Sequence, residues 1–530
     1  MKKIIYVIVL VYILAFCSNN ALAMSLGVIK PTPVPQKTQA CNNSVCDTKY
    51  GCILNRCSTT ITLTCDKCGY VAGGVNDYCG KCGKSIVILP GYGASWNADA
   101  MLLNKKVKDS EWKLLGFAKS NYMPLVDGIT KSVGATKNKV YFWPYDWRRP
   151  IKDISASLDL FINEKVLKGE KIVIVGHSLG GLVGRVWSQD HSSDLRLEKV
   201  ITIGSPQLGS LSAYEAWGFG RVGSGGSDLG SIGLNVLIEL NRKAGQAKSD
   251  AVRGFVPMVK DLLPLYDYAK IFGKLQSYKN METVNTFMEG KNKTISSISG
   301  KLVSIVGIGS STKEGIEIGD IKISNYWHKG GDGTVIENSA GAFGTIKKIT
   351  GSHAGLPVKA LSIVLEELGI NNIKTSSVAE VPLAEQVVIF GDPINRYSLE
   401  CATGGKYESD EFGFIVLDLG IVKNCNIVVK SKVKGDWTYV VGKTDEPISW
   451  KKDSAKVELN KTTNIKVDEK LLEKVLGDTD NPWKIKILPM PTATPTPTPK
   501  PTPTTGSKMK ILPMPTATPT PTPRGKMKLF

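Results

Sequence analysis

Residues 171–185 read KIVIVGHSLGGLVGR, and this stretch decides the fold. The branched apolar residues 172–175 are typical of a short buried strand, and the apolar spacing after Gly180 indicates a helix directly behind it. Between them, Gly-x-Ser-x-Gly (176–180) predicts a sharp strand-to-helix turn, here called the elbow, and the helix after it is the elbow helix. Ser178 lies at the corner of this turn, where its Oγ is exposed. The stretch therefore predicts that Ser178 is a nucleophile. A glycine-rich turn with an incidental serine is the alternative.

Buried strands alternate with helices on both sides of this stretch. Apolar runs at 85–89, 140–143, 199–204 and 302–308 predict strands, and the apolar periodicity of 154–166 predicts a helix. This alternation predicts an α/β fold with a mostly parallel sheet that helices cover on both faces. In such sheets the functional residues gather at the carboxyl ends of strands.

The alternation is interrupted between Gly209 and about residue 300. This region begins glycine-rich and continues with apolar helical segments, so we expect a helical insertion at about 210–300. The insertion is either a lid or cap over the site or an ordinary helical excursion.

A serine nucleophile needs a base, and the chain contains four histidines. We expect the side chain of His177 to point away from the site. His191 follows the elbow helix at the end distant from the serine. His353 lies in the loop Gly-Ser-His-Ala-Gly after a predicted strand, where it would be presented above the sheet. His328 is the other candidate.

Asp332 lies in the glycine turn Gly-Asp-Gly-Thr-Val and offers a carboxylate that could orient an imidazole. The order serine, aspartate, histidine is that of α/β-hydrolases, and it predicts a triad of Ser178, Asp332 and His353. In the alternative, Asp332 is a turn carboxylate and His328 is the base.

Together these residues resemble the lecithin:cholesterol acyltransferase-like branch of the α/β-hydrolase superfamily. The similarity runs from about residue 85 to 368. Besides the elbow it rests on Tyr-Asp-Trp-Arg at 145–148, Gly-Ser-Pro at 204–206 and Gly-Asp-Gly-Thr-Val at 331–335. Gln207 stands where many relatives carry a histidine or an aromatic residue.

The resemblance implies an α/β-hydrolase fold and the same triad. It also implies an oxyanion hole made by the backbone N–H groups of Leu179 and Tyr92, with Asp146 and Arg148 bracing the wall of the site. The activity that it implies is hydrolysis or O-acyl transfer on lipid or other acyl esters, through an acyl-enzyme on Ser178 and with no catalytic cofactor. The alternative is a non-catalytic cell-surface binding or adhesion protein built on a hydrolase-like domain.

The first 23 residues have the pattern of a signal peptide. Two lysines precede a 13-residue apolar stretch, and Ala21-Leu22-Ala23 is a small-x-small cleavage site. We therefore expect a secreted or cell-surface protein. The alternative is that the segment is retained as an anchor.

Residues 24–84 form a predicted cysteine-rich module. Two Cys-x-x-Cys-Gly turns predict a structural, zinc-ribbon-like site, while export favours disulfides instead. The candidate zinc ligands are Cys65, Cys68, Cys79 and Cys82. Four earlier cysteines are disulfide candidates: Cys41, Cys46, Cys52 and Cys57.

The α/β-hydrolase domain is expected to span 85–377. Short alternating runs predict a small β-sandwich at 378–480, in which Cys401 and Cys425 are candidates for one disulfide. Residues 481–530 repeat Pro and Thr and predict an extended, disordered tail.

The formal charge of +19 is concentrated in part in this tail, which carries eight Lys or Arg and no acid. The tail has no interleaved aromatic residues of the kind that stack on bases, so we do not expect nucleic-acid binding. An anionic envelope or lipid surface is the partner that the charge favours.

Overall fold

The structure is a computed structural model. It describes residues 63–64, 71–72, 83–103, 105–134, 137–167, 169–223, 229–319, 323–370, 386–402, 404–418, 422, 424–443 and 450–467. The expected signal peptide, the Pro/Thr tail and the eight cysteines from Cys41 to Cys82 lie outside these residues, so the zinc and disulfide assignments made for those cysteines stay predictions. Two short strands of the front module, β1 (Leu63–Thr64) and β2 (Val71–Ala72), pair antiparallel.

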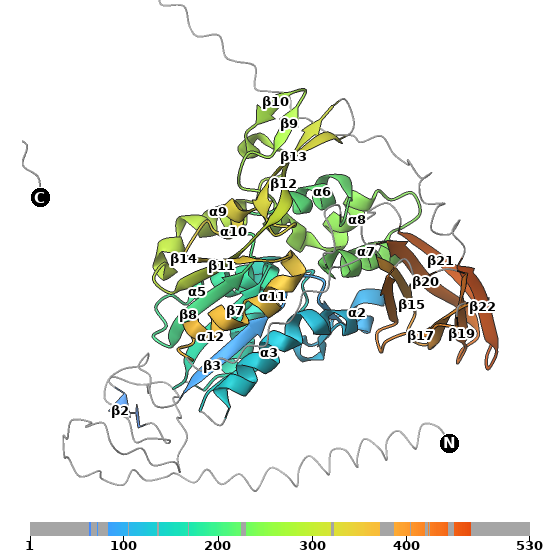
Figure 1. Cartoon of the computed structure of the whole chain (residues 1–530), viewed down its shortest axis with the longest axis horizontal. Helices are drawn as coiled ribbons and strands as arrows, with labels where there is room; N and C mark the ends of the chain where they lie inside the picture. The colour runs from blue at the N-terminus through green and yellow to red at the C-terminus, as the bar shows by residue number, and fades with distance from the viewer. Residues whose placement is uncertain are drawn as a thin grey trace, which may run out of the picture. The chain divides into compact units, whose positions relative to one another are not determined.

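Six strands form the central sheet in the order β14-β11-β8-β7-β3-β6, and all neighbours are parallel (Figure 1). In chain order they are β3 (Lys84–Leu89), β6 (Lys139–Phe142), β7 (Lys171–His177), β8 (Leu197–Ile203), β11 (Leu302–Ile308) and β14 (Thr345–Thr350). This sheet and its helices confirm the α/β-hydrolase fold predicted from the sequence. The elbow follows β7, near the centre of the sheet.

Helices cover both faces of the sheet, because successive residues of a buried strand point to opposite sides. Ile172 and Ile174 of β7 share a core with α4 and α5, whereas Val173 and Val175 share a core with α3, α11 and α12. These helices are α3 (Lys119–Val133), α4 (Ile151–Lys165), α5 (Leu179–Asp190), α11 (Leu356–Lys359) and α12 (Leu361–Glu367).

The insertion between β8 and β11 is helical, as predicted, and it also contains a hairpin. Its main helices are α6 (Leu211–Phe219), α7 (Leu229–Asn241), α8 (Lys248–Phe255), the 3₁₀ segment η3 (Pro257–Leu262) and α9 (Thr286–Lys293). The hairpin pairs β9 (Ala269–Ile271) with β10 (Lys274–Gln276).

This hairpin belongs to a second sheet, of order β10-β9-β12-β13, that the sequence analysis does not anticipate. β12 (Ser310–Ile318) and β13 (Ile323–Gly331) are antiparallel, and β9 lies parallel to β12. The sheet helps to position a candidate site residue, because β13 ends at Gly331 and Asp332 is the next residue of the chain.

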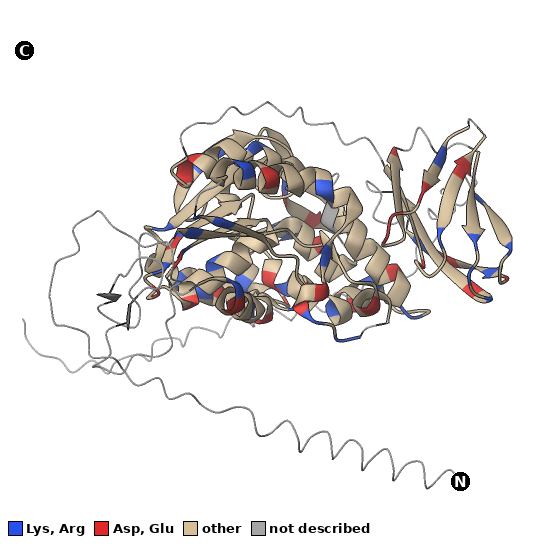
Figure 2. Cartoon of the chain, turned by 90° about the horizontal axis from the view of Figure 1, so that it is seen from below, with Lys and Arg blue, Asp and Glu red and all other residues tan. Residues whose placement is uncertain are grey.

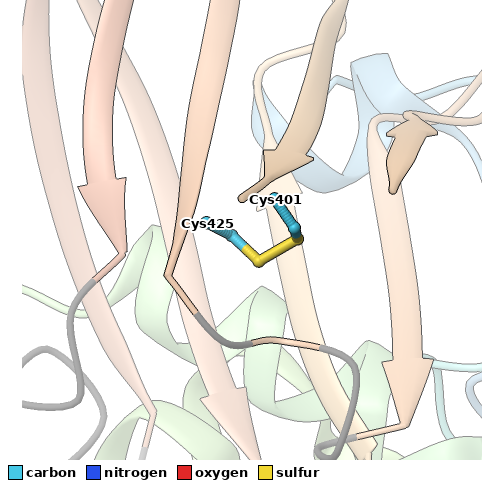
Figure 3. The surroundings of a disulfide bond; sticks show 2 residues. All are labelled: Cys401 and Cys425. Atoms are coloured by element: carbon cyan, nitrogen blue, oxygen red, sulfur yellow. A yellow bond between two sulfur atoms is a disulfide. The ribbon is translucent and has the colours of Figure 1, made fainter. Parts of the chain in front are cut away.

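The C-terminal β-sandwich consists of two antiparallel four-stranded sheets, β18-β15-β20-β21 and β17-β16-β19-β22. Its strands are β15 (Gln386–Gly391), β16 (Tyr397–Cys401), β17 (Lys406–Glu408), β18 (Phe414–Asp418), β19 (Cys425–Lys430), β20 (Gly435–Lys443), β21 (Lys451–Val457) and β22 (Thr462–Val467). A disulfide joins Cys401 of β16 to Cys425 of β19, where the two cysteines face each other across the strands (Figure 3).

Aromatic rings join the sandwich to the α/β-hydrolase part. Trp96, in β4 (Ser95–Trp96), is fully buried, and its ring centroid lies 5.1 Å from that of Phe414 and 5.8 Å from that of Phe390. The ring centroid of Phe117 lies 5.6 Å from that of Phe414, and the two rings meet edge to face. These rings form one continuous apolar core with the residues under the central sheet.

Basic and acidic residues are interspersed along the described helices and strands (Figure 2). Several pair across elements, for example Lys199 with Glu367 at 2.6 Å and Lys84 with Glu198 at 2.6 Å. Among the described helices, none combines the length and the apolar character needed to cross a membrane.

Candidate active site

Ser178 occupies the corner between β7 and α5 with a strained backbone, at φ 51° and ψ −121°. Glycines make this turn sterically feasible. A Cβ on Gly176 would lie 2.4 Å from the backbone of Gly180, and one on Gly180 would lie 2.5 Å from the carbonyl oxygens of Leu89 and Pro90. The elbow therefore packs directly against the end of β3.

Three predicted residues meet at this corner. His353 Nε2 lies 3.0 Å from Ser178 Oγ, and His353 Nδ1 lies 2.7 Å from Asp332 Oδ2. All three residues are at most 4% exposed, so little water reaches them. With Nδ1 protonated and donating to the carboxylate, Nε2 is left to accept the serine proton.

Asp332 is held by its own turn. Its Oδ1 accepts hydrogen bonds from the N–H groups of Thr334 at 3.0 Å and Val335 at 2.7 Å, which leaves Oδ2 for the imidazole. The N–H of His353 also donates to the Asp332 carbonyl at 2.8 Å. Acid and base are thus joined through both backbone and side chain, which fixes the orientation of the imidazole.

His328 does not take this place. It is exposed on β13 and lies opposite Lys313 in the strand pairing, whereas His353 reaches the serine. The structure therefore favours His353 over the alternative base. His191 ends α5, stacks on Trp187 at 4.7 Å and lies 3.1 Å from Asp159, away from the site as expected.

The expectation that the His177 side chain points away from the site is wrong. Its ring lies 4.8 Å from the ring of His353, and its Nε2 lies 2.9 Å from the His353 carbonyl oxygen. A carbonyl can only accept, so Nε2 carries the proton and Nδ1 accepts from the Tyr122 hydroxyl at 2.7 Å. Burial lowers the pKa of His177 well below its usual value, with a further contribution from the nearby His353, which keeps the ring neutral.

Tyr122 extends this chain to the loop after β3. Its hydroxyl oxygen accepts a hydrogen bond from the N–H of Gly91 at 2.9 Å while the hydroxyl proton goes to His177. Gly91 directly precedes Tyr92, whose N–H the resemblance assigns to the oxyanion hole. One hydrogen-bonded chain therefore links this loop to the backbone of the base.

The Tyr-Asp-Trp-Arg motif braces the same loop from the other side. The Tyr145 hydroxyl donates to the carbonyl of Pro90 at 2.8 Å, and Trp147 Nε1 donates to the carbonyl of Ser95 at 2.8 Å. Arg148 pairs with Asp146 through two hydrogen bonds of 2.8 and 2.9 Å. The contacts with the loop come from Tyr145 and Trp147, so the bracing role that the resemblance implies for Asp146 and Arg148 stays a prediction.

Leu179 is the first residue of α5, so its N–H belongs to the first turn, where no partner exists within the helix. A Cβ on Gly91 would lie 3.2 Å from Ser178 Cβ, so the loop that carries Tyr92 touches the nucleophile. Both donors predicted for an oxyanion hole are therefore attached to segments that border Ser178.

A pocket opens beside Ser178, and the insertion supplies most of its apolar wall. Its lining includes Tyr92, Pro206, Ala213, Ala216, Val222, Leu234, Met258, Val259, Leu262 and Val335. Polar side chains occur in it as well, among them Ser210, Ser212, Glu215 and Lys313. A mostly apolar pocket next to the nucleophile suits an acyl chain.

Gln207, the departure from the family pattern, has a structural partner. Its Oε1 accepts a hydrogen bond of 2.6 Å from Arg185, whose other terminal nitrogen donates to Asn292 at 2.7 Å. Arg185 is completely buried between these neutral amides, and burial lowers the pKa of its guanidinium to about 9. Arg185 thus connects the elbow helix to α9 of the insertion, and Gln207 is its second partner and is not among the residues that line the pocket.

Over the described ranges, His, Cys, Asp and Glu side chains do not gather in groups of three that could hold a metal ion. The four cysteines predicted to form a zinc-ribbon-like site lie outside those ranges.

A family model described as lecithin:cholesterol acyltransferase matches residues 113–234. The match includes the elbow and the Tyr-Asp-Trp-Arg motif and ends inside the insertion. Asp332 and His353 lie beyond it. None of the curated proteins matches the chain.

Solved structures of lipases and esterases resemble the chain at low identity. A mature lipase of Bacillus licheniformis is 15% identical, with 56% of this chain and 96% of that one covered and a TM-score of 0.30. A metagenomic carboxyl esterase is 16% identical, with 56% and 78% covered and a TM-score of 0.26. A carboxylesterase structure from the thaumarchaeon Nitrososphaera gargenis is 11% identical, with 54% and 90% covered and a TM-score of 0.26.

Proposed function

We propose that the protein is a serine acyl-ester hydrolase or O-acyltransferase that acts on lipid esters through an acyl-enzyme on Ser178. The observation that carries this proposal is the hydrogen-bonded chain from Asp332 through His353 to Ser178 Oγ. The family match over 113–234 and the apolar pocket support the lipid substrate class. The expected signal peptide supports action outside the cytoplasm, as a secreted or cell-surface enzyme.

The geometry supports a two-step reaction. In the first step, Ser178 Oγ attacks the ester carbonyl while His353 Nε2 takes its proton, and the N–H groups of Leu179 and Tyr92 hold the oxyanion. His353 then gives the proton to the leaving alcohol. In the second step, His353 takes a proton from water or an acceptor alcohol, which attacks the acyl group and releases Ser178. Asp332 stabilises the imidazolium in both steps.

Labelling by a fluorophosphonate probe tests the nucleophile. The unmodified chain should be labelled and should cleave a short p-nitrophenyl ester, and Ser178→Ala should lose both, with kcat lower by roughly a million-fold. Asp332→Asn should lower kcat roughly ten-thousand-fold. Ser120→Ala, at an exposed position of α3, is the matched control and should behave like the unmodified chain. Labelling that survives Ser178→Ala would overturn the assignment.

Hydrolysis and acyl transfer differ in what attacks the acyl-enzyme. We propose to separate them with a labelled phospholipid, offered with and without sterol or glyceride alcohols, by measuring free fatty acid against new ester. New ester that depends on the added alcohol would identify a transferase. Free fatty acid alone would identify a hydrolase.

A non-catalytic binding protein is the other function class. The burial of a complete and hydrogen-bonded triad argues against it, because a binding scaffold has no need to keep three buried polar side chains in register. If clean, folded chain shows neither turnover nor labelling, the binding function replaces the enzymatic one.

A further inference from the structure

The β9–β10 hairpin exposes apolar side chains to solvent. Phe272 is 64% exposed at its turn, and Leu275 is 50% exposed on the following strand. The hairpin lies in the second sheet, which stands beside α6 at the edge of the insertion (Figure 1). Exposing two large apolar side chains so close together costs free energy in water, so their position calls for a physical reason.

The backbone of the turn makes the choice of phenylalanine more costly. Phe272 and Gly273 form a two-residue loop, and both have positive φ, 50° and 75°. Hairpin loops of this kind favour Asn-Gly, and bulky residues rarely adopt a positive φ. Folding stability alone would thus favour asparagine at position 272. At this position the side chain of Phe272 is not buried, and its backbone has an unfavourable conformation.

Three lysines lie near these apolar side chains. Residues 268–281, YAKIFGKLQSYKNM, contain three lysines and no acid, while Asp267 and Glu282 border this stretch and Glu317 lies opposite Lys270 in the pairing of β9 with β12. Lys274 and Lys279 are exposed, whereas Lys270 extends over the ring of Trp327, with 5.2 Å between Nζ and the ring centroid. Leu275 lies opposite Lys270 in the strand pairing and so shares its face of the sheet. The side chains of Phe272 and Leu275, the ring of Trp327 and the lysines thus lie at one end of the sheet.

The hairpin is rigidly connected to the wall of the pocket. β9 pairs in parallel with the end of β12, and β12 also carries Lys313, which lines the pocket beside Ser178. From the neighbouring β13, the Tyr326 hydroxyl donates to Glu215 of α6 at 2.7 Å. Anything that binds the hairpin is therefore held at a fixed place relative to the pocket.

We infer that the β9–β10 hairpin docks the protein on an anionic lipid surface. Phe272 and Leu275 enter the headgroup region, while Lys274 and Lys279 lie against the lipid phosphates. Two protruding side chains cover far less than the roughly 800 Å² per partner of a stable protein interface, which favours a lipid surface over a second copy of the chain. The docking does not depend on the chemistry proposed for Ser178.

Co-sedimentation with lipid vesicles tests this inference in a Ser178→Ala chain freed of its expected signal peptide, so that binding is measured without turnover. The chain should pellet with vesicles of equal parts phosphatidylglycerol and phosphatidylcholine, less so at high salt, and much less with phosphatidylcholine alone. Phe272→Asn should weaken binding at least tenfold while the melting temperature stays equal or rises. Lys274→Gln with Lys279→Gln should weaken it roughly tenfold or more.

Matched controls remove the same groups elsewhere. Leu160→Ser takes away a side chain that is 70% exposed on α4, and Lys131→Gln with Lys152→Gln removes two exposed lysines. These variants should bind vesicles like the parent chain. Equal binding by Phe272→Asn and the parent would overturn the inference, and so would equal losses in hairpin and control variants. A dimer in light scattering that Phe272→Asn abolishes would assign the hairpin to a second copy of the chain and overturn it as well.

Discussion

The imidazole of His177 joins three parts of the site that are far apart in sequence. Through Tyr122 it reaches the N–H of Gly91, and through its own N–H it reaches the carbonyl of the base, His353. Because the ring is buried and neutral, it serves as a fixed spacer that donates on one side and accepts on the other. We therefore expect His177 to act as a positioning residue, through its contacts with Tyr122 and with the backbone of His353.

Tyr122→Phe should separate the oxyanion loop from the base. The change removes one buried hydroxyl and leaves the N–H of Gly91 and Nδ1 of His177 without this partner, at a cost of about 1–3 kcal/mol in unfolding free energy. We expect kcat to fall roughly tenfold with little change in KM, because the loop acts on the transition state. Tyr141→Phe is the control, since Tyr141 donates to the Lys165 carbonyl at the surface. Unchanged kcat in Tyr122→Phe would contradict this role.

Asp261 predicts a pH dependence of stability. Burial raises the pKa of this carboxyl to about 6, although it accepts a hydrogen bond of 2.8 Å from the N–H of Ile151 at the start of α4. Between about pH 4 and pH 6 the folded state therefore binds more protons than the unfolded state, so stability falls as the pH rises through this window. Above pH 6 the full cost, on the order of 3 kcal/mol, is present.

Asp261→Asn should remove this cost and keep the hydrogen bond to Ile151. Its unfolding free energy, measured in urea, should exceed that of the parent at pH 7–8, and the difference should vanish near pH 4. Asp127→Asn, at an exposed position of α3, serves as the control. A difference that is the same at every pH would show that the titration of Asp261 is not its cause.

Sequence patterns could select Ser178, Asp332 and His353 because each lies in a short local motif of glycines whose geometry is nearly independent of the rest of the chain. The partnership of Tyr122 and His177 could not be selected in this way. It joins residues 55 positions apart, and Tyr122 reads as an ordinary apolar position of a helix. A residue whose role arises only when distant segments pack together carries no recognisable pattern in the sequence around it.

At the scale of elements, the elbow depends on the absence of a side chain at Gly180. A methyl group there would lie 2.5 Å from two carbonyl oxygens of β3 and its loop, so strand and helix would have to separate. We expect Gly180→Ala to lower the melting temperature markedly and to abolish probe labelling. Gly290→Ala in α9 is the control, because nothing lies within 4 Å of its added Cβ and alanine favours helix by about 1 kcal/mol. A fully active Gly180→Ala would refute this packing argument.

The second sheet shows why some elements escape prediction. β12 reads SSTKEGIEI, in which charged residues and Gly315 interrupt the apolar alternation that marks a strand. Gly315 is needed because the Trp327 ring occupies the space of its side chain, with 1.9 Å to a built Cβ. The central strands were predictable because they are buried on both faces and need continuous apolar runs.

At the scale of the molecule, the sandwich contributes to the stability of the α/β-hydrolase part. Phe414 inserts between Trp96, Phe117 and Phe390. Phe414→Ala should lower the unfolding free energy by about 3–5 kcal/mol, seen as a clear drop in melting temperature. Leu459→Ala is the control, because Leu459 is largely exposed on the sandwich. If both variants melt alike, the aromatic contact does not hold the two parts together.

The sequence predicts the sandwich but not this contact. An apolar residue on one face of a strand has the same pattern whether it packs inside its own domain or against another. Phe390 in QVVIFG and Phe414 in FIVLD are examples, since these apolar runs mark buried strands without showing which core each ring enters.

Under the proposed mechanism, the order of Ser178, Asp332 and His353 along the chain determines when the protein acquires reactivity during its synthesis. The serine precedes its base by 175 residues, and the strands β3, β6, β7 and β8, with the elbow among them, all emerge from the ribosome before the base is made. A nascent chain or a truncated translation product that ends before residue 353 can therefore carry the nucleophile but no means to deprotonate it. Under the proposed mechanism, such a product should leave lipid esters uncleaved.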